Sequence, residues 1–193
     1  MTQTHIGLFR HGQTDWNINF LLQGVTDIPM NTTGIEQVRT AARALVKDDW
    51  DLIITSPLGR ARETASIIAE QLGFDEIQQH ELLIERSFGA AEGLAYEQWK
   101  EKYSNLDEIP GGESRTDLIA RSSLLLDSFI GTHPGKRILA ISHGALIRTL
   151  LSITSENELP REGERLANAS LNIVSHLDEA WKVTKYDLEP LSP

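Results

Sequence analysis

The sequence predicts an α/β fold: a three-layer α/β/α sandwich with a mainly parallel sheet and an antiparallel edge strand. Short apolar runs typical of buried strands alternate along the chain with segments of helical periodicity. Near the C-terminus, two segments alternate apolar and polar residues and lie close enough to form a hairpin, which predicts the antiparallel edge. With 193 residues, 40% of them hydrophobic, the chain is expected to form a single domain over residues 1–193.

The first half of the chain predicts two strand–helix units. Residues 6–9 are an apolar run that indicates a buried strand. Apolar residues then recur at helical spacing over residues 35–45, behind a segment, Thr33-Gly34-Ile35-Glu36, that resembles a capping box. Residues 52–55 predict the second strand, and a helix is expected over residues 59–72.

The second half predicts further elements of the same two kinds. A short strand is expected near Ile77, and residues 87–113, which lack periodicity, are expected to form a lid or pocket wall. The remaining predicted elements are a helix capped by Ser114, a strand over 137–141, a helix over 144–151, and a hairpin of 171–177 with 181–188.

Composition excludes several classes of protein and partner. The chain has no cysteine, so disulfides and thiolate metal sites are excluded, and its histidines outside the strand ends suggest no metal site. A net charge of −10 argues against nucleic acid as a partner. No apolar run approaches the roughly 18 residues of a membrane span, and the N-terminus lacks a signal sequence, so a cytoplasmic protein without a membrane partner is expected.

Reactive side chains follow three of the predicted strands. Arg10-His11-Gly12 follows the first strand, Arg60 lies shortly after the second, and His143 follows the strand over 137–141. Because parallel strands end at one edge of a sheet, these groups are expected to converge. Arginine forks match phosphate oxygens, and a histidine can accept a phosphoryl group while an acid protonates the leaving oxygen. Glu85 is the candidate acid, and the expected ligand is a small phosphorylated metabolite.

A larger set of motifs extends this pattern over most of the chain. They are Leu8-Phe9-Arg10-His11-Gly12-Gln13-Thr14-Asp15-Trp16-Asn17, Gln23-Gly24, Asp27-Ile28-Pro29-Met30, Thr55-Ser56-Pro57-Leu58-Gly59-Arg60-Ala61, Thr64-Ala65, Glu85, Gly89, Glu92-Gly93 and Ser142-His143-Gly144. In these motifs and their order the chain resembles the histidine phosphatase superfamily. The similar branch holds cofactor-dependent phosphoglycerate mutases and small broad-specificity phosphatases.

The resemblance implies a role for each matched residue. His11 would accept the phosphoryl group, and Glu85 would donate the proton. The residues that would bind the phosphoryl group are Arg10, Arg60, His143 and Asn17. Those that match substrate-side positions are Thr14, Gln23, Gly24 and Gly144, and Arg86 matches a substrate position of the mutases. No cofactor or metal is implied, and the neighbouring arginines are expected to keep His11 neutral.

Departures from the mutase pattern favour hydrolysis of phosphate monoesters. Tyr96 stands where the mutases carry a lysine, and residues 97–113 contain no arginine. A phosphoglycerate mutase is the alternative, kept open by Arg86, and a non-catalytic binding module is a third. The apolar side chains expected at the pocket are Phe20, Leu21, Leu22 and Phe88. The sequence fixes neither the physiological substrate nor the oligomeric state.

Overall fold

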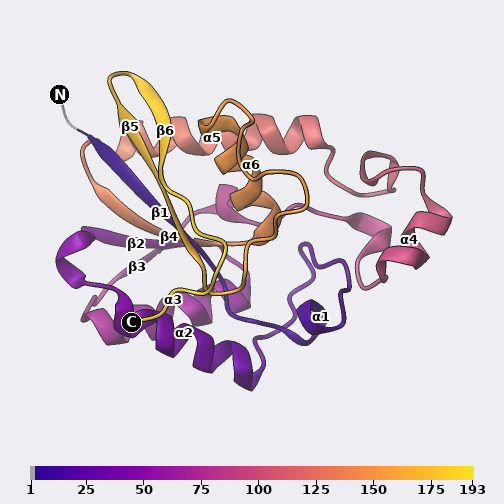
Figure 1. Ribbon diagram of the computed structural model, residues 1–193, viewed down its shortest axis with the longest axis horizontal. Coiled ribbons are helices and arrows are strands. Elements are labelled where there is room, and N and C mark those ends of the chain that lie inside the picture. The colour runs from indigo at the N-terminus through magenta and orange to yellow at the C-terminus, as the bar shows by residue number, and fades with distance from the viewer. Residues whose placement is uncertain (1–2) are drawn as a thin grey trace.

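A six-stranded mixed sheet lies between two layers of helices (Figure 1). The computed structural model describes residues 3–193. The strands, in sheet order, are β3 (Ile77–Gln79), β2 (Leu52–Thr55), β4 (Arg137–Ser142), β1 (Thr4–Arg10), β5 (Leu171–Leu177) and β6 (Ala180–Lys185). The first four are parallel, whereas β5 and β6 are antiparallel to their neighbours. The predicted fold class is therefore confirmed.

Two apolar cores form because successive strand side chains point to opposite faces of the sheet. On one face, α2 (Thr32–Ala44) and α3 (Gly59–Leu72) pack against side chains such as Phe9 and Ile141. On the other face, α5 (Arg115–Thr132) and α6 (Gly144–Thr154) pack against Leu8 and its neighbours. Figure 1 shows these helix pairs on either side of the strands.

The expected start of α2 is wrong by a few residues. Asn31, not Thr33, caps the helix, since the Asn31 side chain accepts a hydrogen bond from Gly34 N at 2.8 Å. Gly34 has a different function, because a Cβ there would overlap the carbonyl of Gln13. The glycine thus allows the loop after β1 to lie directly against the first turn of α2.

The other predicted elements are present, with shifts at their ends. The helix over residues 59–72 and the strand near Ile77 are confirmed, α6 is three residues longer than expected, and β6 is shorter. Short helices that the sequence did not indicate are α1 (Asp15–Ile18), α4 (Tyr96–Lys102) and four 3-10 turns, Lys47–Asp49, Glu81–Leu83, Gly89–Ala91 and Leu106–Glu108.

The short helices α1 and α4 mark the functional end of the molecule. Both lie beyond the carboxyl ends of β1 and β4, at the right of Figure 1. None of the helices in residues 3–193 combines the length and apolar character needed to cross a membrane.

Candidate active site

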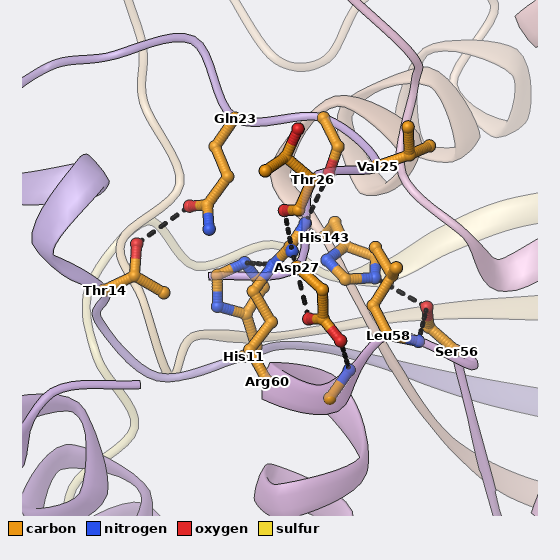
Figure 2. Close-up of polar contacts among 12 residues, drawn as sticks. His11, Thr14, Gln23, Val25, Thr26, Asp27, Ser56, Leu58, Arg60 and His143 are labelled. Atoms are coloured by element: carbon orange, nitrogen blue, oxygen red, sulfur yellow. Dashed lines mark hydrogen bonds and ion pairs between the residues drawn. The ribbon is translucent and has the colours of Figure 1, made fainter. Parts of the chain in front are cut away.

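Two histidines meet at the carboxyl edge of the sheet because their strands are parallel neighbours. β1 and β4 pair in a register that sets Arg10 opposite Ser142, so the next residues, His11 and His143, leave the sheet side by side. Their imidazole rings lie with centroids 5.1 Å apart (Figure 2). Arg60 reaches the same place from α3, which follows β2, and its Nε donates to His11 Nε2 at 3.3 Å.

The protonation of His11 is set by its own loop. Its Nδ1 lies 2.7 Å from Gly12 O, and because a carbonyl only accepts, Nδ1 carries the proton and Nε2 keeps its lone pair. Burial, with smaller contributions from Arg60 and Arg10, holds the pKa of His11 well below its ordinary value. The ring is therefore neutral at pH 7, as expected, although burial outweighs the two arginines as the cause.

Arg60 is immobilised by the loop of residues 23–27. The side chain is fully buried, and its Nη2 and Nη1 donate to Gly24 O at 2.7 Å and Thr26 O at 3.0 Å. Asp27 lies 3.7 Å from Nη1 and also accepts from Gly59 N at 2.7 Å, so one carboxylate ties the loop to the start of α3. Arg60 thus has a fixed position beside His11.

The tautomer of His143 follows from a contact with Ser56. Ser56 Oγ lies 2.7 Å from His143 Nε2 and accepts from Leu58 N at 3.3 Å; among residues 3–193 its hydroxyl proton has no other acceptor than Nε2, so that proton goes to the ring (Figure 2). The imidazole proton then resides on Nδ1. Burial, followed by the charge of Arg60, holds the pKa of His143 well below its ordinary value. Ser56 belongs to a motif noted in the sequence, but no contact with His143 was predicted for it.

Glu85 lies at the N-terminus of α6. Its buried carboxylate accepts hydrogen bonds from Ala145 N at 2.9 Å, Leu146 N at 3.0 Å and Arg86 N at 2.8 Å. The first turn of a helix has free amides that suit a carboxylate. The Glu85 charge also raises the pKa of both Arg10 and Arg60, although desolvation is the larger influence and lowers that of Arg10 to about 10. Glu85 is therefore close enough to both Arg10 and Arg60 for its charge to affect their pKa values.

Gln23 is oriented by two neighbours. Thr14 Oγ1 and Asn17 Nδ2 both donate to Gln23 Oε1, at 2.8 and 3.1 Å. With its oxygen engaged in this way, the amide group of Gln23 points toward the two histidines (Figure 2).

Of the two glycines of the predicted site, only Gly24 is required by close packing. A Cβ at Gly24 would overlap the Glu92 carboxylate and the carbonyl of Arg86, whereas a Cβ at Gly144 would make an ordinary contact of 3.4 Å with the Arg10 guanidinium. The carbonyl of Gly24 also binds Arg60.

Arg86 does not join this cluster. Its Nε donates to Glu113 O at 2.8 Å, its Nη2 binds Asp107 at 2.6 Å, and its guanidinium lies 5.5 Å from the centre of the Phe88 ring. These partners hold residues 107–113 in place. The structure therefore places Arg86 away from the His11 cluster, with its side chain bound by partners within the chain, and its substrate contact stays a prediction.

A cleft of about 840 Å³ adjoins the histidine cluster through Arg10, Asn17 and Asn168, although neither histidine lines it. Its lining includes the expected Phe20, Leu21 and Leu22 but not Phe88. Within the expected lid, only α4 and the residue before it form a wall, through Ala95, Tyr96, Glu97 and Trp99. The other lining residues are Arg10, Asn17, Asn19, Arg165, Leu166 and Asn168.

Sequence reasoning missed residues of the site that lie far along the chain. Asn168 Nδ2 donates to His11 O at 3.0 Å and to Asn17 Oδ1 at 3.1 Å, and Leu166 O accepts from Arg10 Nη1. No motif singled out Asn168, because it precedes β5 and meets His11 only through the pairing of β5 with β1.

The fold and this histidine–arginine cluster are those of a phosphoryl-binding α/β protein, and comparison with known proteins makes the class definite. Residues 6–189 match the family described as Histidine phosphatase superfamily (branch 1), and the chain belongs to it.

Similar proteins carry the names of both phosphatases and mutases. An uncharacterized phosphatase PhoE of Bacillus subtilis is 36% identical over 96% of this chain and 95% of its own length. A metal-independent phosphoserine phosphatase of Arabidopsis thaliana is 34% identical, over 98% of this chain and 84% of its own. A probable phosphoglycerate mutase GpmB of Yersinia pestis is also 34% identical, over 94% and 89%.

A solved phosphatase structure has a similar fold. A mycobacterial glucosyl-3-phosphoglycerate phosphatase superposes with a TM-score of 0.83 at 26% identity, covering 97% of this chain and 100% of the other.

Proposed function

We propose that the protein is a phosphatase that hydrolyses small phosphate monoesters through a phosphohistidine intermediate at His11. One observation carries the proposal. Among residues 3–193, the buried side-chain atoms without a hydrogen-bond partner include Arg10 Nε, Gln23 Nε2 and His143 Nδ1, all on residues of the His11 cluster. An unsatisfied buried donor costs about 1–3 kcal/mol. Three such donors around one nucleophile indicate a ligand with several acceptor oxygens, which a phosphate group provides.

The chemistry follows from the positions of the protons. His11 Nε2 attacks phosphorus while the ester P–O bond breaks, and Arg10 and Arg60 stabilise the charge on the remaining oxygens. Glu85 takes up a proton from solvent when the anionic ester binds beside it, and it then gives this proton to the leaving oxygen. Water then attacks the phosphohistidine, Glu85 takes up a proton from that water, and inorganic phosphate leaves with His11 restored.

Hydrolysis is favoured over the mutase reaction by the surroundings of the cluster. Tyr96 adds no charge at the position of the mutase lysine, and the guanidinium of Arg86 is held by Asp107 and Glu113. The two positions that match mutase cations therefore add no free positive charge at the cluster. The relatives named as phosphatases support the same choice.

The proposed reaction uses no metal. The two arginines and His143 provide the donors and positive charge that phosphoryl transfer needs. Within residues 3–193, no group of three or more histidine or acidic side chains is arranged to hold a metal ion. A non-catalytic binding role is disfavoured because the nucleophile, both arginines and the acid are all present in one cluster.

The test is a panel of phosphate monoesters with His11→Ala. We expect the native chain to release inorganic phosphate and His11→Ala to lose at least about 1000-fold in kcat, because no other group can form the intermediate. His133→Ala, which alters a histidine in the turn after α5, is the matched control. Acid-labile, base-stable phosphorylation of the native chain, absent from His11→Ala, identifies the intermediate.

Two results would contradict the proposal. The first is bisphosphoglycerate-dependent exchange between 2- and 3-phosphoglycerate that outruns hydrolysis, which would show a mutase. The second is phosphate binding without phosphorylation or turnover of any ester, which would show a binding module.

A further inference from the structure

The cleft beside His11 contains a cation for which hydrolysis itself provides no role. Arg165 lines this cleft together with Arg10 and Asn17, and its side chain is exposed. Within residues 3–193 the Arg165 guanidinium has no ion pair, whereas Arg161 on the same segment pairs with Glu164. A guanidinium offers five donors in a planar fork, and those of Arg165 face a cleft that leads to the nucleophile.

The backbone around Arg165 is fixed relative to His11. Leu166 O accepts from Arg10 Nη1, Ala169 N donates to Arg10 O at 3.0 Å, and Asn168 Nδ2 donates to His11 O at 3.0 Å. These contacts, all made by residues that follow Arg165, tie the segment to the loop that carries His11. A second group on a ligand bound at His11 can therefore be selected by its position relative to Arg165.

The Phe20 ring contacts the Arg165 guanidinium, and the Phe20 backbone adopts an unfavourable conformation. The Arg165 guanidinium lies 6.0 Å from the centre of the Phe20 ring, within the range of a cation–π contact. Phe20 follows the C-cap of α1 with φ at 53°, a left-handed conformation that glycine adopts most easily at helix ends. The ring is nevertheless 71% exposed, so core packing does not explain the choice of phenylalanine. Contact between the Phe20 ring and the apolar part of a bound molecule would explain this choice of residue.

Other residues that line the cleft differ from Arg165 in character. Leu22 and Trp99 extend the apolar lining, and Glu97 of α4 adds a negative charge. A bound anionic group is repelled on the Glu97 side and attracted on the Arg165 side. The cleft therefore suits an ester whose phosphate binds at His11, whose apolar body lies on Phe20, and whose second anion points toward Arg165.

We propose that Arg165 is a specificity-determining residue that binds a carboxylate on the organic part of the phosphate ester. The inference rests on the proposed phosphatase function and names its substrate class as carboxylated monoesters with an apolar or aromatic body. A carboxylate is the acceptor whose two oxygens match the guanidinium fork.

The test compares aryl phosphates that differ in one group. The probes are 3- and 4-carboxyphenyl phosphate and the corresponding carbamoylphenyl phosphates, which keep the shape and remove the charge. Their Kd values are measured by calorimetry with His11→Ala, so that binding is read without turnover. We expect His11→Ala to bind at least one carboxylate about 5- to 10-fold more tightly than its amide. Adding Arg165→Gln should abolish this preference.

Arg161→Gln is the matched control, because it removes the same charge from the same segment outside the cleft. It should keep the preference. Equal binding of acids and amides by His11→Ala, or a preference that survives Arg165→Gln, would overturn the inference. Turnover by the native chain separates the two proposals. Hydrolysis without a carboxylate preference would refute only the role of Arg165, and a preference without hydrolysis would refute only the phosphatase.

Discussion

The tautomer of His11 is set by the carbonyl of the next residue in its loop. Gly12 O fixes the proton on Nδ1, and Arg60 Nε meets the lone pair of Nε2 at 3.3 Å. That distance is long for a hydrogen bond, so an incoming phosphate can take the Arg60 donor for its own oxygens at little cost. The arginine would then change from a partner of the nucleophile to a partner of the group being transferred.

Residue types near strand ends were sufficient to find the central cluster. The sequence pointed to His11, Arg60 and His143 because arginine and histidine rarely follow three buried strands without a reason. It could not find Ser56 or Asn168, whose contacts depend on how β2 and β5 are placed. It also could not show that Asp107 holds Arg86, because the segment between them has no regular periodicity.

Glu85→Gln tests the proton donor through its dependence on the leaving group. Glycerol phosphate releases an alkoxide that needs a proton, whereas 4-nitrophenyl phosphate releases an anion that is stable without one. We expect the phosphorylation rate in single turnovers to fall about 100- to 10,000-fold for glycerol phosphate and less than about 10-fold for 4-nitrophenyl phosphate. Glu81→Gln, on an exposed side chain nearby, is the control. Equal losses with both esters would assign the proton to another group.

At the scale of elements, the loop of residues 23–27 is held by one carboxylate. Glu92 accepts hydrogen bonds from Val25 N at 3.0 Å, Thr26 N at 2.7 Å, Thr26 Oγ1 and Phe88 N at 3.1 Å. Partial burial opposes its ionisation, but these hydrogen bonds hold the pKa of Glu92 below its ordinary value. Because the same loop binds Arg60 through two carbonyls, Glu92 positions Arg60 without touching it.

Glu92→Gln should loosen this loop, since one acceptor becomes an amide that faces backbone donors. A hydrogen bond to a charged group contributes about 1.5–3 kcal/mol. We expect KM for a phosphate monoester to rise about 10-fold with a smaller change in kcat, and Tm to fall by roughly 3–6 °C. Glu101→Gln, on the exposed face of α4, should change neither. A lower Tm with unaltered KM would leave Glu92 with a structural role only.

The order of the elements was predictable, but their junctions were less so. Apolar runs and helical spacing located each long strand and helix, because both patterns are local. The start of α2 was missed because Gly34 is required by the loop after β1, a contact between separate segments. The short helices α1 and α4 have no periodicity of their own, and they form where the chain closes over the cleft.

For the whole molecule, two buried neutral histidines make stability depend on pH. The pKa values of His11 and His143 are lowered well below 6.5 in the folded chain and return to about 6.5 on unfolding. Below pH 6.5 the unfolded chain therefore binds protons that the folded chain does not, and acid favours unfolding. For each histidine, the decrease in the free energy of unfolding approaches roughly 1 kcal/mol per pH unit.

We expect Tm, measured without phosphate, to be level above pH 7 and to fall by about 5 °C or more between pH 7 and pH 5. Carboxylates change the stability only at lower pH. An example is Asp51, whose hydrogen bond from Arg137 lowers its pKa to about 2. His143→Asn should have a shallower slope in this window, because it removes one titrating ring. A Tm that stays constant from pH 7 to pH 5 would show that the two rings take up protons in the folded chain as readily as in the unfolded chain.

The pairing of β1 with β5 has a consequence for how the protein is made. Asn168 and Ala169 hold the backbone of the loop that carries His11, and Ser170 O accepts from Arg10 N. Because synthesis runs from the N-terminus, residues 12–168 must all follow His11 before these contacts can form. A nascent chain therefore carries His11 long before the loop around it can be held in place.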